Sequence, residues 1–61
     1  MKIKEIIKII EDDGWCFSRQ NGSHRQFKHP IKKGAVTVAG KSSDDLDKGT
    51  QKSILRQAGL N

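Results

Sequence analysis

The sequence is poor in the residue types that build large or covalently braced cores. Its 61 residues include no tyrosine, one tryptophan, two phenylalanines, one proline and one cysteine. The single cysteine, Cys16, excludes an intrachain disulfide and supplies no zinc framework. No apolar run has the length of a secretory or membrane-spanning segment, so we expect a cytoplasmic protein without membrane association. The length allows one domain, residues 1–61, with one small core.

Acidic residues are absent from the middle of the chain. All seven lie at or before Asp13 or after Ser43. Six cations lie in the acid-free block, namely Arg19, Arg25, Lys28, Lys32, Lys33 and Lys41. The net charge of +5 and the pI of about 9.7 favour nucleic acid or an acidic protein surface as a partner. On charge alone, a solvated basic surface explains the block equally well.

Apolar spacing predicts two helices. Isoleucines recur at i, i+3, i+4 and i+7 from Ile3 to Ile10, which is typical of a helix buried along one stripe. We expect this helix over residues 1–13, with Gly14 as its stop. A second helix is expected from about residue 48 or 50 to residue 58, with Ile54, Leu55 and Ala58 as its apolar face. Asp47 or Thr50 would cap its N-terminus, and Gly59 would end it before Leu60.

Three strands are expected between these helices, over residues 15–20, 24–29 and 35–39. Asn21-Gly22 is a signal for a type I′ hairpin turn, and Pro30 ends the second strand. A second turn is expected at residues 32–34, and a polar loop at 40–47. The predicted fold class is therefore α+β, with a three-stranded antiparallel sheet, both helices on one face and the other face open.

Strand alternation predicts which side chains occupy each face. Trp15 and Phe17 are expected in the core with Phe27, Val36 and Val38. Arg25 and His29 nominally share that side, Arg25 with its head in water and His29 leaving the sheet beside Pro30. The open face is expected to carry Ser18, Gln20, His24, Gln26, Lys28 and Thr37.

A histidine on a basic, solvent-facing sheet can exchange a proton near neutral pH, although most exposed strand histidines are simply solvated. His24 and His29 would lie about 16 Å apart on opposite faces of a regular strand, too far to flank one phosphate without a bend. Cys16 and the histidines lack metal-ligand spacing, and no acid is placed to orient a Cys–His pair. We therefore expect no metal and no other cofactor.

Three segments resemble the HicA toxin family. The stretch GSHRQF, residues 22–27, resembles the family's Gly-Ser-His-x-x-Phe/Tyr signature. The preceding DGWCFSRQN resembles its first strand and hairpin, and KGTQKSILRQAGL, residues 48–60, resembles its closing helix. Lys48 departs from the proline that the family frequently has before Gly-Thr. The resemblance extends over nearly the whole chain.

This resemblance implies a double-stranded-RNA-binding-domain-like fold, α-β-β-β-α. It also implies the toxin of a type II toxin–antitoxin pair: an endoribonuclease that cleaves mRNA, arrests translation and growth, and is neutralised by a HicB-type antitoxin. The family's catalytic histidine corresponds to His24, the expected general acid or base. RNA contacts are expected from Ser23, Arg25, Gln26, Lys28, Arg19, Lys32, Lys33 and Lys41.

Within that set, Lys28 is the first candidate to stabilise charge on the phosphate, followed by Arg25 and Arg19. Gln26 and Ser23 are expected near phosphate or the 2′-OH, and the other three lysines are expected to attract the RNA backbone. The second proton-transfer group stays open between water, Lys28 and a displaced His29. Two alternatives stand beside the nuclease: a non-catalytic RNA-binding module that uses the same face, and a domain that docks an acidic protein.

Overall fold

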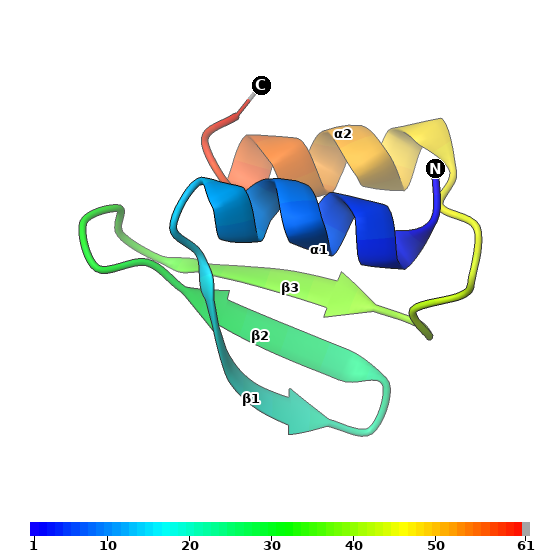
Figure 1. Ribbon diagram of the computed structural model, residues 1–61, viewed down its shortest axis with the longest axis horizontal. Coiled ribbons are helices and arrows are strands. Elements are labelled where there is room, and N and C mark those ends of the chain that lie inside the picture. Colours follow the sequence, from blue (N-terminus) through cyan, green and yellow to red (C-terminus); the bar gives the residue numbers. More distant parts are fainter. Residues whose placement is uncertain (61) are drawn as a thin grey trace.

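A computed structural model describes residues 1–60 of the chain. Over these residues the elements are α1 (Ile3–Asp12), β1 (Cys16–Asn21), β2 (His24–Lys28), β3 (Ala35–Ala39) and α2 (Lys48–Gln57). The strands form one antiparallel sheet in the order β1-β2-β3. Both helices cover the same face of this sheet (Figure 1). The predicted α+β, double-stranded-RNA-binding-domain-like fold is thus confirmed.

Helix α1 is held at both ends by local contacts. The carboxylate of Glu5 accepts a hydrogen bond from the Lys2 backbone N–H at 2.6 Å, satisfying a donor that the helix leaves free. The isoleucine stripe is buried as the spacing predicted. The helix ends at Asp12, and Gly14, whose N–H donates to the Glu11 carbonyl at 2.9 Å, follows with a φ of 112° that residues with a Cβ rarely adopt.

Helix α2 has the caps that its sequence predicts. Asp47 accepts from the Thr50 backbone N–H at 3.1 Å and from the Thr50 hydroxyl at 2.6 Å. At the other end, Gly59 N–H donates to the Arg56 carbonyl at 3.1 Å, and Leu60 N–H donates to the Leu55 carbonyl at 2.8 Å. This pair of bonds, with Gly59 at φ 71°, is a Schellman motif.

The core lies between the helices and the sheet. It contains the isoleucines of α1 with Trp15, Phe27, Val36, Val38, Leu46, Ile54 and Ala58. Leu46 belongs to the loop at residues 40–47, for which the sequence predicts only a polar segment. It is 8% exposed, and its N–H donates to the Met1 carbonyl at 2.8 Å, so the loop closes one end of the core.

The prediction that Phe17 belongs to the core is wrong. Its side chain is 54% exposed, although it pairs with Phe27 on the helix-facing side. The reason is position in the sheet, because β1 is an edge strand that lies farthest from the helices (Figure 1). Phe17 keeps an edge-on contact with Phe27, with ring centroids 6.1 Å apart.

The predicted hairpin is present, but its turn is not of type I′. The pairing of Asn21 with His24 leaves Gly22 and Ser23 as the two loop residues. Only Gly22 has a positive φ, 62°, and no non-glycine residue among those described has one. A type I′ turn needs positive φ at both positions, whereas glycine at the first position alone is typical of type II′. Asn21 therefore ends β1 instead of forming the turn.

Candidate functional site

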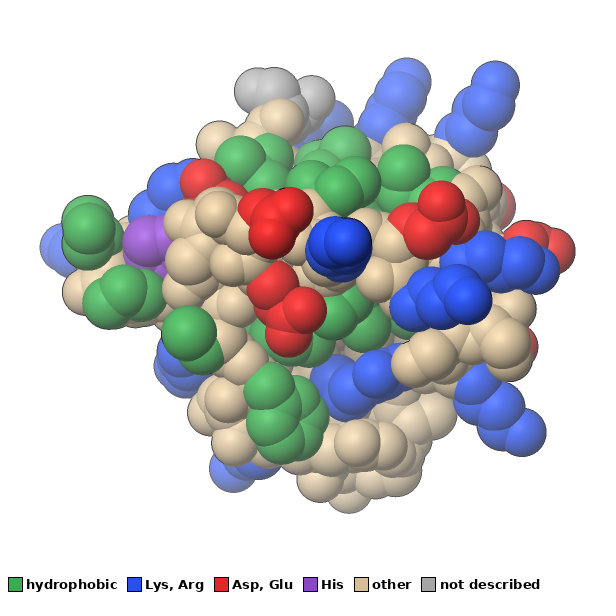
Figure 2. All heavy atoms as spheres, in the orientation of Figure 1, with side chains coloured by type: hydrophobic (Ala, Val, Ile, Leu, Met, Phe, Trp, Pro, Cys, Tyr) green, Lys and Arg blue, Asp and Glu red, His purple; other side chains and the backbone are tan. Residues whose placement is uncertain are grey.

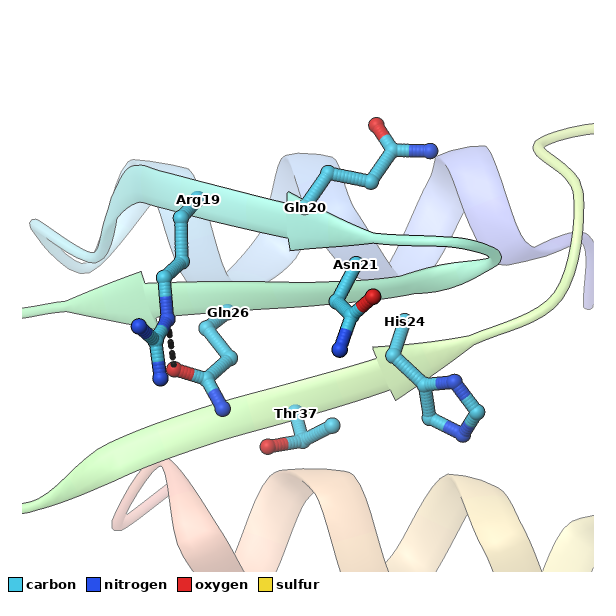
Figure 3. Close-up of a pocket in the computed structure, with 6 residues that line it drawn as sticks. All are labelled: Arg19, Gln20, Asn21, His24, Gln26 and Thr37. Carbon is cyan, nitrogen blue, oxygen red and sulfur yellow. Dashed lines mark hydrogen bonds between the residues drawn. The ribbon is translucent and has the colours of Figure 1, made fainter.

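A bulge in β1 decides which side chains lie on the open face. The pairing passes from Phe17–Phe27 directly to Arg19–Gln26, so Ser18 has no partner in β2. Directly paired residues share a face of the sheet, so Arg19 lies on the same side as Gln26 and Thr37. Gln20 pairs with Arg25, so its side chain lies on the helix side and not, as predicted, on the open face, although the residue borders the hollow beside His24. Figure 3 shows Gln20 pointing away from the other labelled side chains.

His24 stands at the hairpin end of the open face. It pairs with Asn21 on β1 and Ala39 on β3, and its side chain is exposed. The surface beside it is a shallow hollow of about 500 Å³, lined by Arg19, Gln20, Asn21, His24, Gln26 and Thr37. Within this hollow, Arg19 Nε donates to Gln26 Oε1 at 3.3 Å (Figure 3). The lining contains a histidine, an arginine and neutral polar groups, and no carboxylate.

Ser23, Arg25 and Lys41 lie around the same end of the sheet but outside that hollow. They line a second depression of about 430 Å³ with Gln20, Gly22, Gly40 and Ser42. Arg25 is half-buried there, and its Nη2 donates to the Gly40 carbonyl at 3.3 Å and to the Ser42 hydroxyl at 3.2 Å. Arg25 lies on the helix-facing side of the sheet, as alternation with His24 predicts, but its head is bonded to the 40–42 loop.

Both ring nitrogens of His29 form hydrogen bonds with the backbone. Its Nδ1 accepts from the backbone N–H groups of Ile31 and Lys32, each at 3.0 Å. Nε2 therefore carries the proton, and it donates to the Asp13 carbonyl at 2.8 Å. The ring packs edge-on against Trp15 at a centroid distance of 5.2 Å, and the side chain is 7% exposed. His29 has thus left the sheet beside Pro30, as predicted.

Lys32 is likewise engaged with the protein. Its ammonium lies 2.6 Å from Asp13 Oδ2 and 3.0 Å from the Ala58 carbonyl at the end of α2. A cation is favourable there because helix C-termini carry partial negative charge. The hydrogen bond from Lys32, above all, holds the pKa of the Asp13 carboxyl below its ordinary value.

Lys28 and Lys33 are exposed at the end of the sheet opposite His24. Lys28 shares the face of His24, as predicted, but it lies four positions farther along the strand, a distance of about 14 Å. Gln26 is only about 7 Å along the strand from His24, and Arg19 lies opposite Gln26. The side chains nearest to His24 are therefore not those that the sequence ranked first.

Acidic and basic side chains are distributed unequally between the helices and the sheet. In Figure 2 the acidic side chains gather mainly over the helices, whereas only basic ones are visible among the charges over β1. Among residues 1–60, no group of three or more His, Cys, Asp or Glu is placed to hold a metal ion. In the same part of the chain, no helix is both long and apolar enough to cross a membrane.

A comparison with protein families matches residues 3–60 to the family described as the HicA toxin of bacterial toxin–antitoxin systems. The chain belongs to the HicA toxin family. A comparison with curated proteins gives no match. This HicA chain is accordingly the toxin component of a toxin–antitoxin system, and the family implies a cognate antitoxin as its partner.

The motif that carried the resemblance to HicA now has a physical explanation. Gly22 supplies the positive φ of the turn, and Phe27 anchors β2 in the core at 1% exposure. Between them, His24 is left in solvent on the uncovered face. Sequence reasoning did not find Asn21 or Ser42 beside this end of the sheet. The only signal for Asn21 was its place before Gly22, which was taken as part of the turn.

Proposed function

We propose that this HicA protein is a metal-independent endoribonuclease that cleaves mRNA, and therefore acts in the cytoplasm. The observation that carries the proposal is the contrast between the two histidines. His24 is exposed at the edge of a hollow without carboxylates, whereas both ring nitrogens of His29 are occupied by backbone partners. One imidazole is therefore free to exchange a proton with a bound substrate.

In the proposed reaction, the RNA 2′-oxygen attacks the adjacent phosphorus and the bond to the 5′-oxygen breaks. The 2′-OH loses a proton and the leaving 5′-oxygen gains one, giving a 2′,3′-cyclic phosphate and a 5′-OH. His24 performs one of these two proton transfers as general base or general acid, and water supplies the other. A positioned histidine contributes on the order of 10²–10⁴-fold to such a rate.

Negative charge gathers on the phosphate oxygens in the transition state, and the nearest cation stabilises it. We assign this role to Arg19, with Gln26 as a hydrogen-bond donor to phosphate or the 2′-OH. Their mutual hydrogen bond holds both side chains over the hollow. Lys28 and Lys33 attract the RNA backbone farther along, while Lys32, already paired with Asp13, contributes only to the overall field.

A HicB-type antitoxin would neutralise this activity by covering His24 and the open face. The open face carries Arg19 and Lys28, its hollow has no carboxylate, and both helices lie on the other side of the sheet, so an acidic partner surface fits it by charge (Figure 1). Loss of cleavage on adding the antitoxin, with His24 protected from chemical modification in the complex, would support this arrangement. A complex with the open face left in solvent would refute it.

The decisive experiment compares purified wild type with His24→Ala on a long RNA in the presence of a metal chelator. We expect the wild type to fragment the RNA and the variant to leave it intact while still binding it. If both proteins bind RNA and neither cleaves it, the chain is an RNA-binding module. If the variant cleaves as well as the wild type, His24 is not the proton-transfer group.

A further inference from the structure

We propose that Arg25, Lys41, Ser23 and Ser42 form a second phosphate subsite, separate from the hollow beside His24. It would hold a neighbouring phosphodiester of the same RNA whose scissile phosphate lies at His24. The inference rests on the proposed ribonuclease function and adds to it a path for the RNA. That path passes over the hairpin end of the sheet, from the open face to the side that carries the helices.

The depression has the chemistry of a phosphate site. Two cations and two hydroxyls line a depression of about 430 Å³ together with Gly22 and Gly40. The guanidinium is a permanent cation with several hydrogen-bond donors, and hydroxyl donors complete such sites. The lining includes no carboxylate; Asp44 lies outside it, accepting from the Lys41 backbone N–H at 3.0 Å.

Arg25 is already oriented for this task. Its two hydrogen bonds to the 40–42 loop both come from Nη2. Within residues 1–60, Nε and Nη1 make no further hydrogen bond, so these donors remain for a ligand. An arginine fixed in this way loses less side-chain entropy on binding than a fully mobile one. Lys41, in contrast, is exposed, and its ammonium makes no hydrogen bond or ion pair with the described residues.

The backbone connects this subsite directly to His24. Ser23, His24 and Arg25 are consecutive, and successive strand side chains point to opposite faces of a sheet. The side chain of His24 therefore lies on the open face, and that of Arg25 lies on the helix-facing side. The Gly40 N–H donates to the Ser23 carbonyl at 3.0 Å, which ties the 40–42 loop to the hairpin. An RNA backbone crossing this end would meet both sites in succession.

The test uses binding to an RNA that cannot be cleaved, so that it does not depend on catalysis. The probe is a labelled 2′-O-methyl oligouridylate of about eight nucleotides, within the range that small single-strand binders cover. Affinity is measured by fluorescence anisotropy over a series of salt concentrations for the wild type, Lys41→Met, Arg25→Lys and Lys52→Met. Lys52 is an exposed lysine of α2 outside the depression and serves as the matched loss of one charge.

We expect Lys41→Met to bind about tenfold more weakly, and the slope of log affinity against log salt to fall by about 0.7 for the lost contact. Arg25→Lys keeps its charge, so it should lose affinity with little change of slope, because an ammonium cannot bond to the loop as Nη2 does and still present the separate donors of Nε and Nη1. Lys52→Met should behave like the wild type. Thermal melting checks that each variant folds, which matters for Arg25 because of its bonds to the loop.

Wild-type affinity and slope in a folded Lys41→Met variant would overturn the subsite, even if the wild type cleaves RNA. The expected losses, in a protein that leaves unmodified RNA intact, would support the subsite while refuting the proposed catalysis. As an independent check, one phosphodiester at a time is replaced by an uncharged methylphosphonate. At one position the wild type should lose affinity and Lys41→Met should lose distinctly less; equal losses at every position would contradict the proposal.

Discussion

The imidazole Nε2 of His29 donates a hydrogen bond to the backbone carbonyl of Asp13 at 2.8 Å. This contact joins the end of α1 to the segment after β2, across sixteen residues of sequence. Lys32 binds the Asp13 carboxylate at the same place, and Trp15 packs against the ring. His29 therefore joins separate segments of the fold at one end of the sheet, while the side chain of His24 is exposed at the opposite end.

Removing His29 should destabilise the protein. His29→Ala leaves the Asp13 carbonyl and the half-buried Lys32 N–H without their partner, and we expect a loss of about 1–3 kcal/mol in the free energy of unfolding. His24→Ala, at an exposed position, should stay within about 0.5 kcal/mol of the wild type. Urea denaturation measures both, and equal stabilities would contradict the structural role assigned to His29.

The same pair of variants should separate in the opposite sense in an RNA cleavage assay. His24→Ala is expected to lower the rate constant on the order of 10²–10⁴-fold, because a positioned proton-transfer group is gone. His29→Ala, measured where it remains folded, should retain most of its activity. A folded His29→Ala protein as inactive as His24→Ala would mean that both histidines take part in the reaction.

Replacing Gly14 by alanine should crowd the imidazole of His29. A Cβ there would lie 2.7 Å from His29 Nε2, and the φ of 112° disfavours any side chain. We expect Gly14→Ala to cost about 1–3 kcal/mol from the backbone strain and a further loss from displacing the imidazole. Gly34→Ala is the matched control, since Gly34 has a φ of 85° and no atom within 4 Å of its Cβ position. Equal destabilisation by the two variants would exclude the predicted steric effect.

The two phenylalanines should differ sharply in their contribution to stability. Phe27 is 1% exposed, so Phe27→Ala should cost about 3–5 kcal/mol through lost burial and the cavity left behind. Phe17 is 54% exposed and keeps mainly its edge-on contact with Phe27, so Phe17→Ala should cost only about 0.5–1.5 kcal/mol. Chemical denaturation of both variants decides the point; comparable losses would place Phe17 in the core.

Lowering the pH should reduce the free energy of unfolding, in part through protonation of the Asp13 carboxyl. The hydrogen bond from Lys32 lowers the pKa of this carboxyl in the folded state, so the ionised form is favoured there. Such a group stabilises the fold above its unfolded pKa, near 3.8, and this contribution is lost as the pH falls through the folded value. Asp13→Asn should be less stable at neutral pH and lose less stability on acidification. A stability profile parallel to that of the wild type from pH 6 to about 2 would contradict this linkage.

The helices and the core strands could be predicted because local patterns encode them. The isoleucine spacing marked α1, and Asp47 and Gly59 marked the ends of α2, where side-chain and backbone hydrogen bonds satisfy the helix termini. Leu46 was missed because a single leucine in a polar loop has no periodicity. Its N–H donates to the Met1 carbonyl, which is distant in sequence, so its place in the fold involves a contact that no local pattern shows.

The site itself was only partly predictable. The identity of His24 and its exposure followed from the motif and from alternation with Phe27. Its neighbours did not follow, because the bulge at Ser18 moves Arg19 onto the open face and Gln20 off it. A bulge changes the side of every later residue on the strand, and alternation within one segment carries no sign of it.

The sequence by itself determined the order of elements, the basic block and the motif that resembles the family's signature, since each depends on residue types at fixed local spacing. Only the tertiary structure decided which cations remain available to a ligand. Lys32 is held by Asp13 and the end of α2, whereas Arg19 and Lys41 reach the surface on either side of His24. The physical reason is that pairing of charges depends on through-space distances of a few ångströms, which the chain fixes only when its distant segments pack together.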